Sequence, residues 1–405
     1  MLAAKTKSSI TVKIFRSIFN RVKRVLQLPI IEIWRLQAIK NSKEAFVRLP
    51  NPNHAVFVCD QINVRAIKLA FALTGKGWKI ALLHREELPY DVSDFFFETK
   101  KFKHRWDALQ IASRSSAGIF HVFSNYHFEL AYTFTRYKPG KVIFDNYDLL
   151  TGMFKDAASI TNYTDLEQYC YTHADGICSR DLRIQYLKKL GYTLPNRILF
   201  SEYCWPGKKF IRSSKLKDGI HVVYVGSIEL NPESPVGYLY ELASHLSSAG
   251  IHLHIYPSHM SIINLLKTNM LQFLTPDVIK KYVHIHETIS LLNLREEISK
   301  YHYGILISSK TMKFGEDNET YFEHMGDYFL PSKSFDYLDA GLYTLSQNAK
   351  YVRFMLERYK NGCVVSSFDE IVEICRHEPP NSVVVPSALL LETNADRLEN
   401  FYFNL

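Results

Sequence analysis

The sequence predicts an α/β protein made of two doubly wound domains that face each other across a central cleft. Three observations support this prediction. The chain has 405 residues, which is too long for one ordinary hydrophobic core. Short apolar runs alternate with segments of helical periodicity, which is typical of buried parallel strands joined by helices. This alternation breaks once, in "WPGKKFIRSSKLKDG", and then starts again.

The first series of alternating segments predicts a domain over residues 50–205. It opens with "HAVFVCD", a buried strand, followed by "VRAIKLAFALTGKG", a helix that ends on glycines. The other segments are assigned in the same way. The expected strands are 54–60, 78–84, 117–124, 141–148, the end of 165–179, and 196–204, and the expected helices are 64–77, 126–137, the start of 165–179, and 180–192.

A linker over 206–219 and a second domain over 220–385 follow. The second series opens with the apolar run "IHVVYVGS". Its expected strands are 220–227, 251–258, 282–288, 303–309 and 362–367, and its expected helices are 237–250, 294–301, 332–340 and 369–375. Residues 386–405 are expected to form a C-terminal helix that could pack back on the first domain.

Residues 1–45 form a separate basic segment. Seven cations precede Glu32, the first acidic residue, and apolar residues recur at helical spacing from Ile10 to Leu26. A helix of this kind can lie in an anionic membrane surface. The pattern leaves two alternatives open: a helix that packs on the body of the protein, and a cleaved transit peptide.

Composition and missing motifs argue against several classes of structure and function. The chain is 47% hydrophobic and 22% charged, which disfavours disorder. Its six cysteines form no C-x-x-C pair, so reduced thiols in the cytoplasm are expected, and neither a disulfide framework nor a metal site. The sequence contains no run of 18 apolar residues, which is about the length that a membrane-spanning helix needs. The sequence lacks a glycine-rich dinucleotide fingerprint, a P-loop and a nucleophile elbow, which weakens the interpretations as a dehydrogenase, a P-loop kinase and a hydrolase. It also lacks a D-x-D motif that would hold a divalent cation on a diphosphate. No nucleic-acid partner is expected.

The stretch "PSKSFDYLDAG", residues 331–341, carries the clearest chemical signal. Ser332 suits the N-cap of a helix, where backbone N–H groups and the helix dipole favour an anion. Lys333 adds a positive charge, and Asp336 lies one turn further on. The spacing fits a diphosphate at the start of the helix with its ribose on Asp336. An ordinary capped helix with Phe335 and Leu338 in the core is the alternative.

The same stretch resembles a segment of GT-B glycosyltransferases, especially the retaining family 4 type. Further segments are similar to that family in the same order, over residues 50–390: "KVIFDNYD", "HADGICSRDLRIQYLKKLGY", "VVYVGSIE" and "LREEISKYHYGILIS". The resemblance implies two Rossmann-like domains and transfer of a sugar from a nucleotide-diphosphate sugar, by analogy with retention, and with no cofactor and no metal. Departures from the family pattern are Tyr328, where the family has its first glutamate, and the lack of a cation in "GSIELNPESPVG".

The resemblance and the strand ends together give the candidate site residues. Catalytic roles are expected for Asp145, Asp148 and Lys333, and contact with the acceptor for Tyr126 and His127. Contact with the nucleotide sugar is expected for Gly226, Ser227, His286, Lys310, Ser332, Lys333, Ser334 and Asp336.

The expected function is therefore glycosyl transfer in the synthesis of a surface polysaccharide or glycoconjugate. The acceptor would be a glycan or a lipid-linked glycan, and the enzyme would be cytoplasmic, at the inner face of an anionic membrane. Two alternatives remain: a sugar-nucleotide epimerase of the same architecture, and a non-catalytic protein that keeps the fold and binds nucleotide or glycan.

Overall fold

The structure is a computed structural model of the whole chain. It describes residues 29–37, 40, 53–88, 91–124, 128–147, 149, 163–206, 212–226, 228, 238–258, 260–290, 292–306, 328, 330–347, 350–379 and 383–405. Within these ranges, no helix has both the length and the apolar character needed to cross a membrane.

The N-terminal domain is built on a seven-stranded sheet in the order β3-β2-β1-β4-β5-β6-β7, and each neighbouring pair is parallel. The strands are β1 (His54–Cys59), β2 (Lys79–His84), β3 (Glu98–Lys101), β4 (Ile119–Ser124), β5 (Lys141–Asn146), β6 (Gly176–Ser179) and β7 (Asn196–Leu199). The connecting helices are α2 (Val64–Thr74), α3 (Arg105–Ser113), α4 (Glu129–Tyr137), α7 (Tyr163–His173) and α8 (Arg183–Lys189).

The C-terminal domain repeats this winding in a six-stranded parallel sheet, in the order β10-β9-β8-β11-β12-β13. Its strands are β8 (His221–Gly226), β9 (His252–Pro257), β10 (Val283–Ile285), β11 (Tyr303–Leu306), β12 (Tyr343–Gln347) and β13 (Gly362–Val365). Its helices are α9 (Tyr238–Ser248), α10 (Ile263–Met270), α11 (Pro276–Tyr282), α12 (Leu294–Ile298), α14 (Lys333–Asp339), α15 (Lys350–Tyr359) and α16 (Phe368–Cys375).

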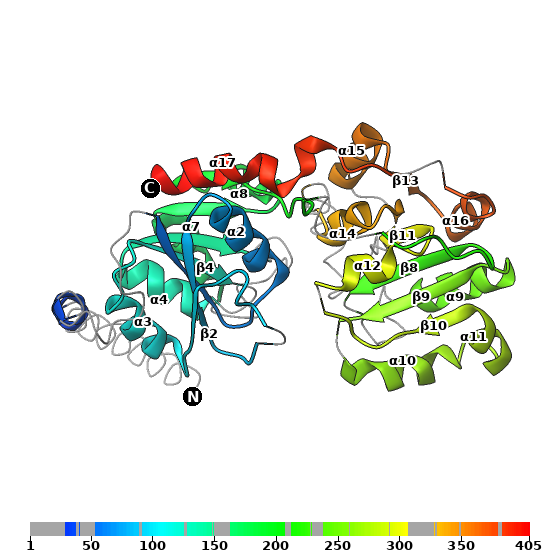
Figure 1. Cartoon of the computed structure of the whole chain (residues 1–405), viewed down its shortest axis with the longest axis horizontal. Helices are drawn as coiled ribbons and strands as arrows, with labels where there is room; N and C mark the ends of the chain where they lie inside the picture. Colours follow the sequence, from blue (N-terminus) through cyan, green and yellow to red (C-terminus); the bar gives the residue numbers. More distant parts are fainter. Residues whose placement is uncertain are drawn as a thin grey trace, which may run out of the picture.

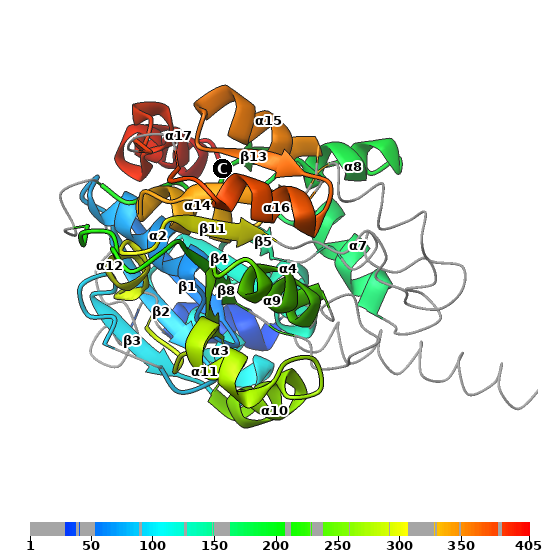
Figure 2. The ribbon, with the colours of Figure 1, turned by 90° about the vertical axis from the view of Figure 1, so that its right-hand side faces the viewer.

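The two domains lie side by side, and the arrowheads of β8 and β9 point toward the N-terminal domain (Figure 1). Figure 2 shows the molecule with the C-terminal domain toward the viewer. In each sheet the winding direction reverses beside the first strand, between β1 and β4 and between β8 and β11. Ligands of doubly wound sheets bind outside the carboxyl ends of the strands at this reversal.

The last helix, α17 (Leu391–Phe403), returns from the C-terminal domain to lie along the N-terminal domain (Figure 1). Trp78 Nε1 donates a hydrogen bond to Glu399 of this helix at 3.0 Å, and the chain before it forms a bridge between Leu390 and Cys204. The described part of the predicted linker, from residue 212, also contacts the C-terminal domain, because Arg212 donates hydrogen bonds to the carbonyls of Leu338 and Asp339 at the end of α14.

The predicted fold class of two doubly wound domains is confirmed. Most of the strands that sequence patterns located are buried and apolar, such as β1, in which all six residues are buried. Strand β12 was not predicted, although Thr344, Leu345 and Ser346 in it are buried. Strand β3, with the sequence ETKK, was not predicted because it is a short, largely exposed edge strand without an apolar pattern. All six cysteines are described, and none forms a disulfide.

Candidate functional site

Helix α14 is fixed over the carboxyl end of the C-terminal sheet by one tyrosine. The Tyr337 ring lies against Gly304 of β11, where an added Cβ would come within 2.4 Å of the ring. The Tyr337 hydroxyl accepts a hydrogen bond from the Val225 N–H at 3.1 Å and donates to the Ile305 carbonyl at 3.0 Å. One side chain therefore bridges β8 and β11 at the point where the winding direction reverses.

Lys333 lies one helical turn before Tyr337 and faces the same side of α14. Its ammonium donates to the Tyr224 hydroxyl at 3.0 Å and lies 4.1 Å from the centroid of that ring. A Cβ added to Gly226, which has φ +122°, would lie 2.8 Å from Cε of Lys333. Only glycine combines this backbone angle with room for the lysine, so Gly226 and Lys333 form one arrangement at the end of β8.

The first turn of α14 differs from the predicted anion-binding turn. Ser332 occupies the N-cap position, but its backbone is helical and its side chain makes no capping hydrogen bond. The N–H groups of Ser334 and Phe335 already donate to the carbonyls of Pro331 and Ser332. Ser334 is buried, and its hydroxyl has no hydrogen-bond partner in the described part of the chain. The positive charge at this end of the helix therefore comes from Lys333.

The N-terminal domain meets this region with Tyr147, which follows β5. Its hydroxyl lies 3.5 Å from Oγ of Ser332. The Arg180 guanidinium, from the residue after β6, lies 4.0 Å from the centroid of the Tyr147 ring. The contact of Tyr147 with Ser332 thus joins the carboxyl edges of both sheets, with Lys333 in one domain and Arg180 in the other.

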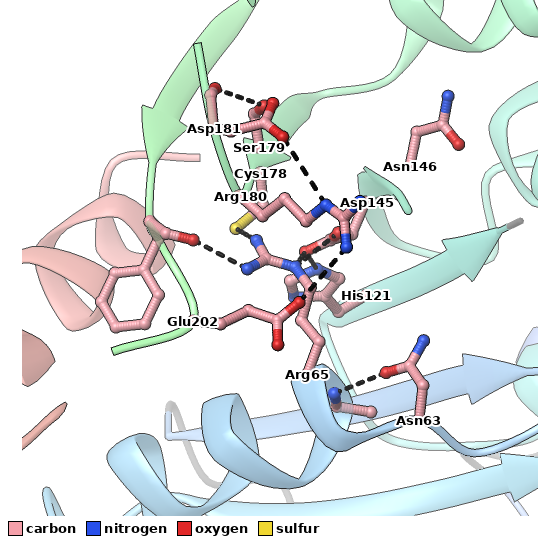
Figure 3. Close-up of polar contacts among 12 residues, drawn as sticks. Asn63, Arg65, His121, Asp145, Asn146, Cys178, Ser179, Arg180, Asp181 and Glu202 are labelled. Carbon is pink, nitrogen blue, oxygen red and sulfur yellow. Dashed lines mark hydrogen bonds and ion pairs between the residues drawn. The ribbon is translucent and has the colours of Figure 1, made fainter. Parts of the chain in front are cut away.

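Figure 3 shows the buried polar network behind this edge. Arg65 of α2 donates through Nε to both carboxylate oxygens of Asp145 at 2.8 Å, and through Nη1 to the Phe200 carbonyl at 2.7 Å. His121 Nε2 lies 3.1 Å from the Asp145 carboxylate. Burial acts to raise the pKa of Asp145, but Arg65 and His121 outweigh it and lower the pKa to about 2.

Asp145 is 1% exposed, and its carboxylate is fully engaged with Arg65 and His121. This arrangement supports a structural role, and the assignment of Asp145 as a catalytic group stays a prediction. His121, Asp145 and Cys178 are the one group of potential metal ligands among the described residues with three donor atoms within 4.8 Å of one another. The Arg65 guanidinium already provides the positive charge there, since it also donates to Sγ of Cys178 at 3.2 Å.

Arg180 is held by two carboxylates of its own domain (Figure 3). Its Nη1 lies 3.6 Å from Glu202 and its Nε lies 3.6 Å from Asp181. Burial raises the pKa of Glu202, although Arg180 and Lys68 act in the opposite direction. Asp181 in turn accepts from the N–H of Leu330, just before α14, at 3.4 Å. The Arg180 region is therefore connected to the chain that leads into Lys333.

The other face of α14 contacts the N-terminal domain through two carboxylates. Asp336, predicted to hold a ribose, lies 4.0 Å from the ammonium of Lys68 on α2. Burial raises the pKa of Asp336. Asp339 accepts from the Trp205 N–H at 3.1 Å, and burial raises its pKa to about 6 although Lys68 and Arg295 oppose this shift. The ribose role of Asp336 stays a prediction, and the observed contact is an ion pair between domains.

The remaining predicted residues separate into two groups. His286 follows β10 and lies 2.9 Å from His254 through ring nitrogens, with its ring stacked on Tyr256 at 4.2 Å. It belongs to a group of histidines rather than to the Lys333 region, and its contact with a base stays a prediction. Five predicted residues lie outside the described residues: Tyr126, His127, Asp148, Ser227 and Lys310.

Sequence reasoning missed Tyr147 and Arg180. The strand-end argument pointed to Asp145, but β5 continues to Asn146, and Tyr147 is the residue that reaches the other domain. The same argument applied to β6 would have found Arg180, because it directly follows Ser179, the last residue of that strand. Arg65 gave no signal, since its partner Asp145 lies 80 residues away in the sequence.

No protein-family model matches the chain, and no curated protein sequence matches it. Solved structures do match. HepE of Anabaena in complex with UDP-glucose aligns with a TM-score of 0.56 at 9% identity, over 86% of this chain and 97% of that one. Sucrose-phosphate synthase from Thermosynechococcus elongatus aligns with a TM-score of 0.54 at 11% identity, over 86% and 95%.

A third match is UDP-GlcNAc 2-epimerase from Methanocaldococcus jannaschii, with a TM-score of 0.51 at 8% identity, over 87% of this chain and 99% of that one. At these identities the likeness concerns the fold, which is the two-domain GT-B architecture along nearly the whole of each compared chain. Transferases and an epimerase share this fold, so it does not by itself decide the reaction.

Proposed function

We propose that this protein is a glycosyltransferase that moves a sugar from a nucleotide-diphosphate sugar to a glycan or lipid-linked glycan, with retention. The observation that carries the proposal is the position of Lys333. Tyr337 and Gly226 place its ammonium at the carboxyl end of β8, beside the winding reversal and opposite the N-terminal domain. A leaving diphosphate at this point would have a fixed positive charge beside it.

Electrostatic stabilisation of this kind needs no resident metal, because the lysine is held in place before the substrate binds. From the other domain, the Arg180 guanidinium lies 4.0 Å from the centroid of the Tyr147 ring, where Glu202 and Asp181 hold it. HepE of Anabaena, whose fold is similar to this one, was solved in complex with UDP-glucose, which is a donor of the proposed class. The proposed place of work is the cytoplasmic face of a membrane, with residues 1–45 as the contact.

An epimerase of the same fold is the second candidate, because UDP-GlcNAc 2-epimerase aligns over 87% of this chain. Epimerisation of the sugar requires acid and base groups on both faces of the ring.

The test is incubation with a panel of UDP-, ADP- and GDP-sugars in the presence of glycan and lipid-linked glycan acceptors, with release of free nucleoside diphosphate measured and the sugar product identified by NMR. A glycoside with retained anomeric configuration supports the proposal, and an epimerised sugar supports the second candidate. Release no faster than the uncatalysed background would overturn both. Turnover should persist in EDTA, whereas activity that requires added Mn²⁺ would contradict a metal-independent transferase.

A binding experiment checks the site itself. Loss of a charge-assisted hydrogen bond costs about 1.5–3 kcal/mol, so Lys333→Ala should weaken binding of the nucleoside diphosphate about 10- to 150-fold. Lys267→Ala, an exposed lysine of α10 in the same domain, is the matched control. Equal affinity of the Lys333→Ala variant and the wild type in calorimetry would remove the site assignment.

A further inference from the structure

Histidines cover part of one face of the C-terminal sheet. Side chains alternate between the faces of a strand, so residues two apart share a face. On β8, β9 and β10 the residues of one face, such as Val222, Leu253 and Val283, pack into the core that contains α9. The opposite face carries the set that we call the histidine face: His221, His252, His254, His284 and His286.

Strand register brings these rings into close contact. His221 pairs with His252 across β8 and β9, and His254 pairs with His284 across β9 and β10. The two pairs of rings stack with centroids 4.5 Å and 4.4 Å apart and planes within 13° and 18° of parallel. The histidine face is therefore an ordered array that the sheet itself positions.

Ring nitrogens also approach one another along the array. His252 Nδ1 lies 3.1 Å from His284 Nε2, and His254 Nδ1 lies 2.9 Å from His286 Nε2. At these distances one nitrogen donates a proton and the other accepts it. Each accepting nitrogen presents a lone pair to its neighbour, which is the electron pair that a metal ion would use.

The outer pair is the accessible one. His221 and His254 are buried, His221 Nε2 is bonded to Asp218, and the Tyr301 ring is stacked on His254 at 4.1 Å. His252 and His284 are half-buried, so solvent and small ions can reach them. Burial and the neighbouring His252 lower the pKa of His284.

We propose that His252 Nδ1 and His284 Nε2 bind one divalent transition-metal ion of the Cu²⁺, Ni²⁺ and Zn²⁺ class, with water in the other coordination positions. Their separation of 3.1 Å is close to that of two adjacent ligands of one ion, since metal–nitrogen bonds of about 2.0–2.1 Å give an angle of about 95–100°. Each ring needs only to turn about its Cβ–Cγ bond, a torsion with a broad minimum in histidine.

The chemistry of the donors selects the ion. Neutral imidazole suits copper, nickel and zinc, and affinity for such a site is expected to be highest for Cu²⁺. Mg²⁺ and Ca²⁺ prefer oxygen ligands and should not bind. When the ion binds, the proton that the two rings share moves to the outward nitrogen of one ring, so that both facing nitrogens offer a lone pair to the ion.

The test uses the full chain without an affinity tag, stripped by chelator and titrated with CuCl₂, NiCl₂ and ZnCl₂ in a calorimeter. We expect saturable binding of Cu²⁺, and a loss of affinity of at least about tenfold in His252→Gln and in His284→Gln. His245→Gln on α9, a histidine of the same domain outside the histidine face, is the control and should bind as the wild type does. Electron paramagnetic resonance of the Cu²⁺ complex should show imidazole nitrogen coupling that weakens in both variants.

A measurement on the unaltered protein covers the case in which a variant does not fold. Cu²⁺ should protect His252 and His284 from modification by diethyl pyrocarbonate and leave His245 unprotected, as read by mass spectrometry. No saturable binding by the wild type, or wild-type affinity in folded His252→Gln and His284→Gln variants, would overturn the proposal. Unchanged modification of His252 and His284 in the presence of Cu²⁺ would overturn it as well.

Discussion

Asp145→Asn is the change that most directly tests how the N-terminal domain is held together. The substitution keeps the size of the side chain and removes its charge. Arg65 would then remain fully buried without its carboxylate partner. If Asp145 instead contacts a substrate, the variant should lose activity and keep its stability, so a single variant separates the structural role from the catalytic one.

The magnitude follows from the burial of the pair, with Arg65 0% and Asp145 1% exposed as side chains. Breaking a buried ion pair by removing one partner costs about 3–5 kcal/mol. The pKa of Asp145 gives a smaller free energy. This pKa is lowered from 3.8 to about 2, and a shift of one pKa unit is worth about 1.4 kcal/mol, so the shift corresponds to about 2 kcal/mol. We therefore expect a loss of about 2–5 kcal/mol in the free energy of unfolding at neutral pH.

Urea unfolding followed by tryptophan fluorescence reports on the N-terminal part of the chain, because all four tryptophans lie between residues 34 and 205. With a slope of about 2–3 kcal/mol per molar urea, the midpoint of the variant should fall by about 1–2 M. Asp60→Asn is the control, since Asp60 forms a partly exposed pair with Arg85 at 3.2 Å, and such pairs contribute at most about 1 kcal/mol.

A second variant tests the reasoning further. Replacing both partners, in Arg65→Met with Asp145→Leu, removes the buried charges together, and the double variant should be more stable than the sum of the single effects predicts. The effect of pH has a definite sign. A depressed pKa gives stability that is present above pH 3.8 and is lost as the pH falls toward 2. A midpoint for Asp145→Asn within roughly 0.3 M of the wild type would refute the account.

Three further predictions follow from the site and the N-terminal segment. Gly226→Ala should lower the affinity for nucleoside diphosphate about as much as loss of Lys333, since the added Cβ would displace that lysine; calorimetry showing wild-type affinity would contradict the contact. Asp339 has a pKa raised to about 6, so its contribution to stability is complete below about pH 4 and lost as the pH rises through 6. The unfolding free energy of the wild type relative to Asp339→Asn should therefore increase as the pH falls from 7 to 4, and a constant difference would exclude this titration. A chain that starts at Asn41 lacks the packing of Ile31 with Leu109 and Tyr137; it should still bind nucleotide but lose salt-sensitive sedimentation with anionic vesicles, whereas unfolding of that chain would show that the fold needs this packing.

The sequence predicted the fold well because buried parallel strands leave a local signal. Continuous apolar runs located β1, β2, β4 and β8, and the pause around residue 205 separated the two series. The signal fails where a segment has no apolar pattern, whether it is exposed or buried. Strand β3 is charged and exposed, and α3 has no pronounced apolar face, so neither was predicted. Strand β12 was not predicted either, because its sequence YTLSQ is half polar although Thr344, Leu345 and Ser346 are buried. The helices α10, α11 and α15 were also missed. The winding order of the sheets follows from the rules for doubly wound folds rather than from any single residue.

The candidate site was harder to predict because its contacts join distant parts of the chain. Lys333 was identified from its local motif, and the structure places it beside Gly226, which was also predicted. Its fixed position depends on Tyr224, more than 100 residues earlier, which no local pattern indicates. Tyr147 lies two residues beyond Asp145. A shift of two residues at the end of one strand therefore separates the predicted residue, Asp145, which forms a buried ion pair, from Tyr147, which contacts the other domain.

The stretch "PSKSFDYLDAG" is the joint between the two domains, which explains its mixture of residues. Lys333 and Tyr337 lie one turn apart and face the C-terminal sheet. Asp336 and Asp339 face the N-terminal domain, through Lys68 and the backbone of Trp205. A helix of seven residues therefore carries the cation of the proposed site on one side and the interdomain contacts on the other. A shift of one domain against the other would change the contacts of Asp336 and Asp339, and these residues lie on the same helix as Lys333.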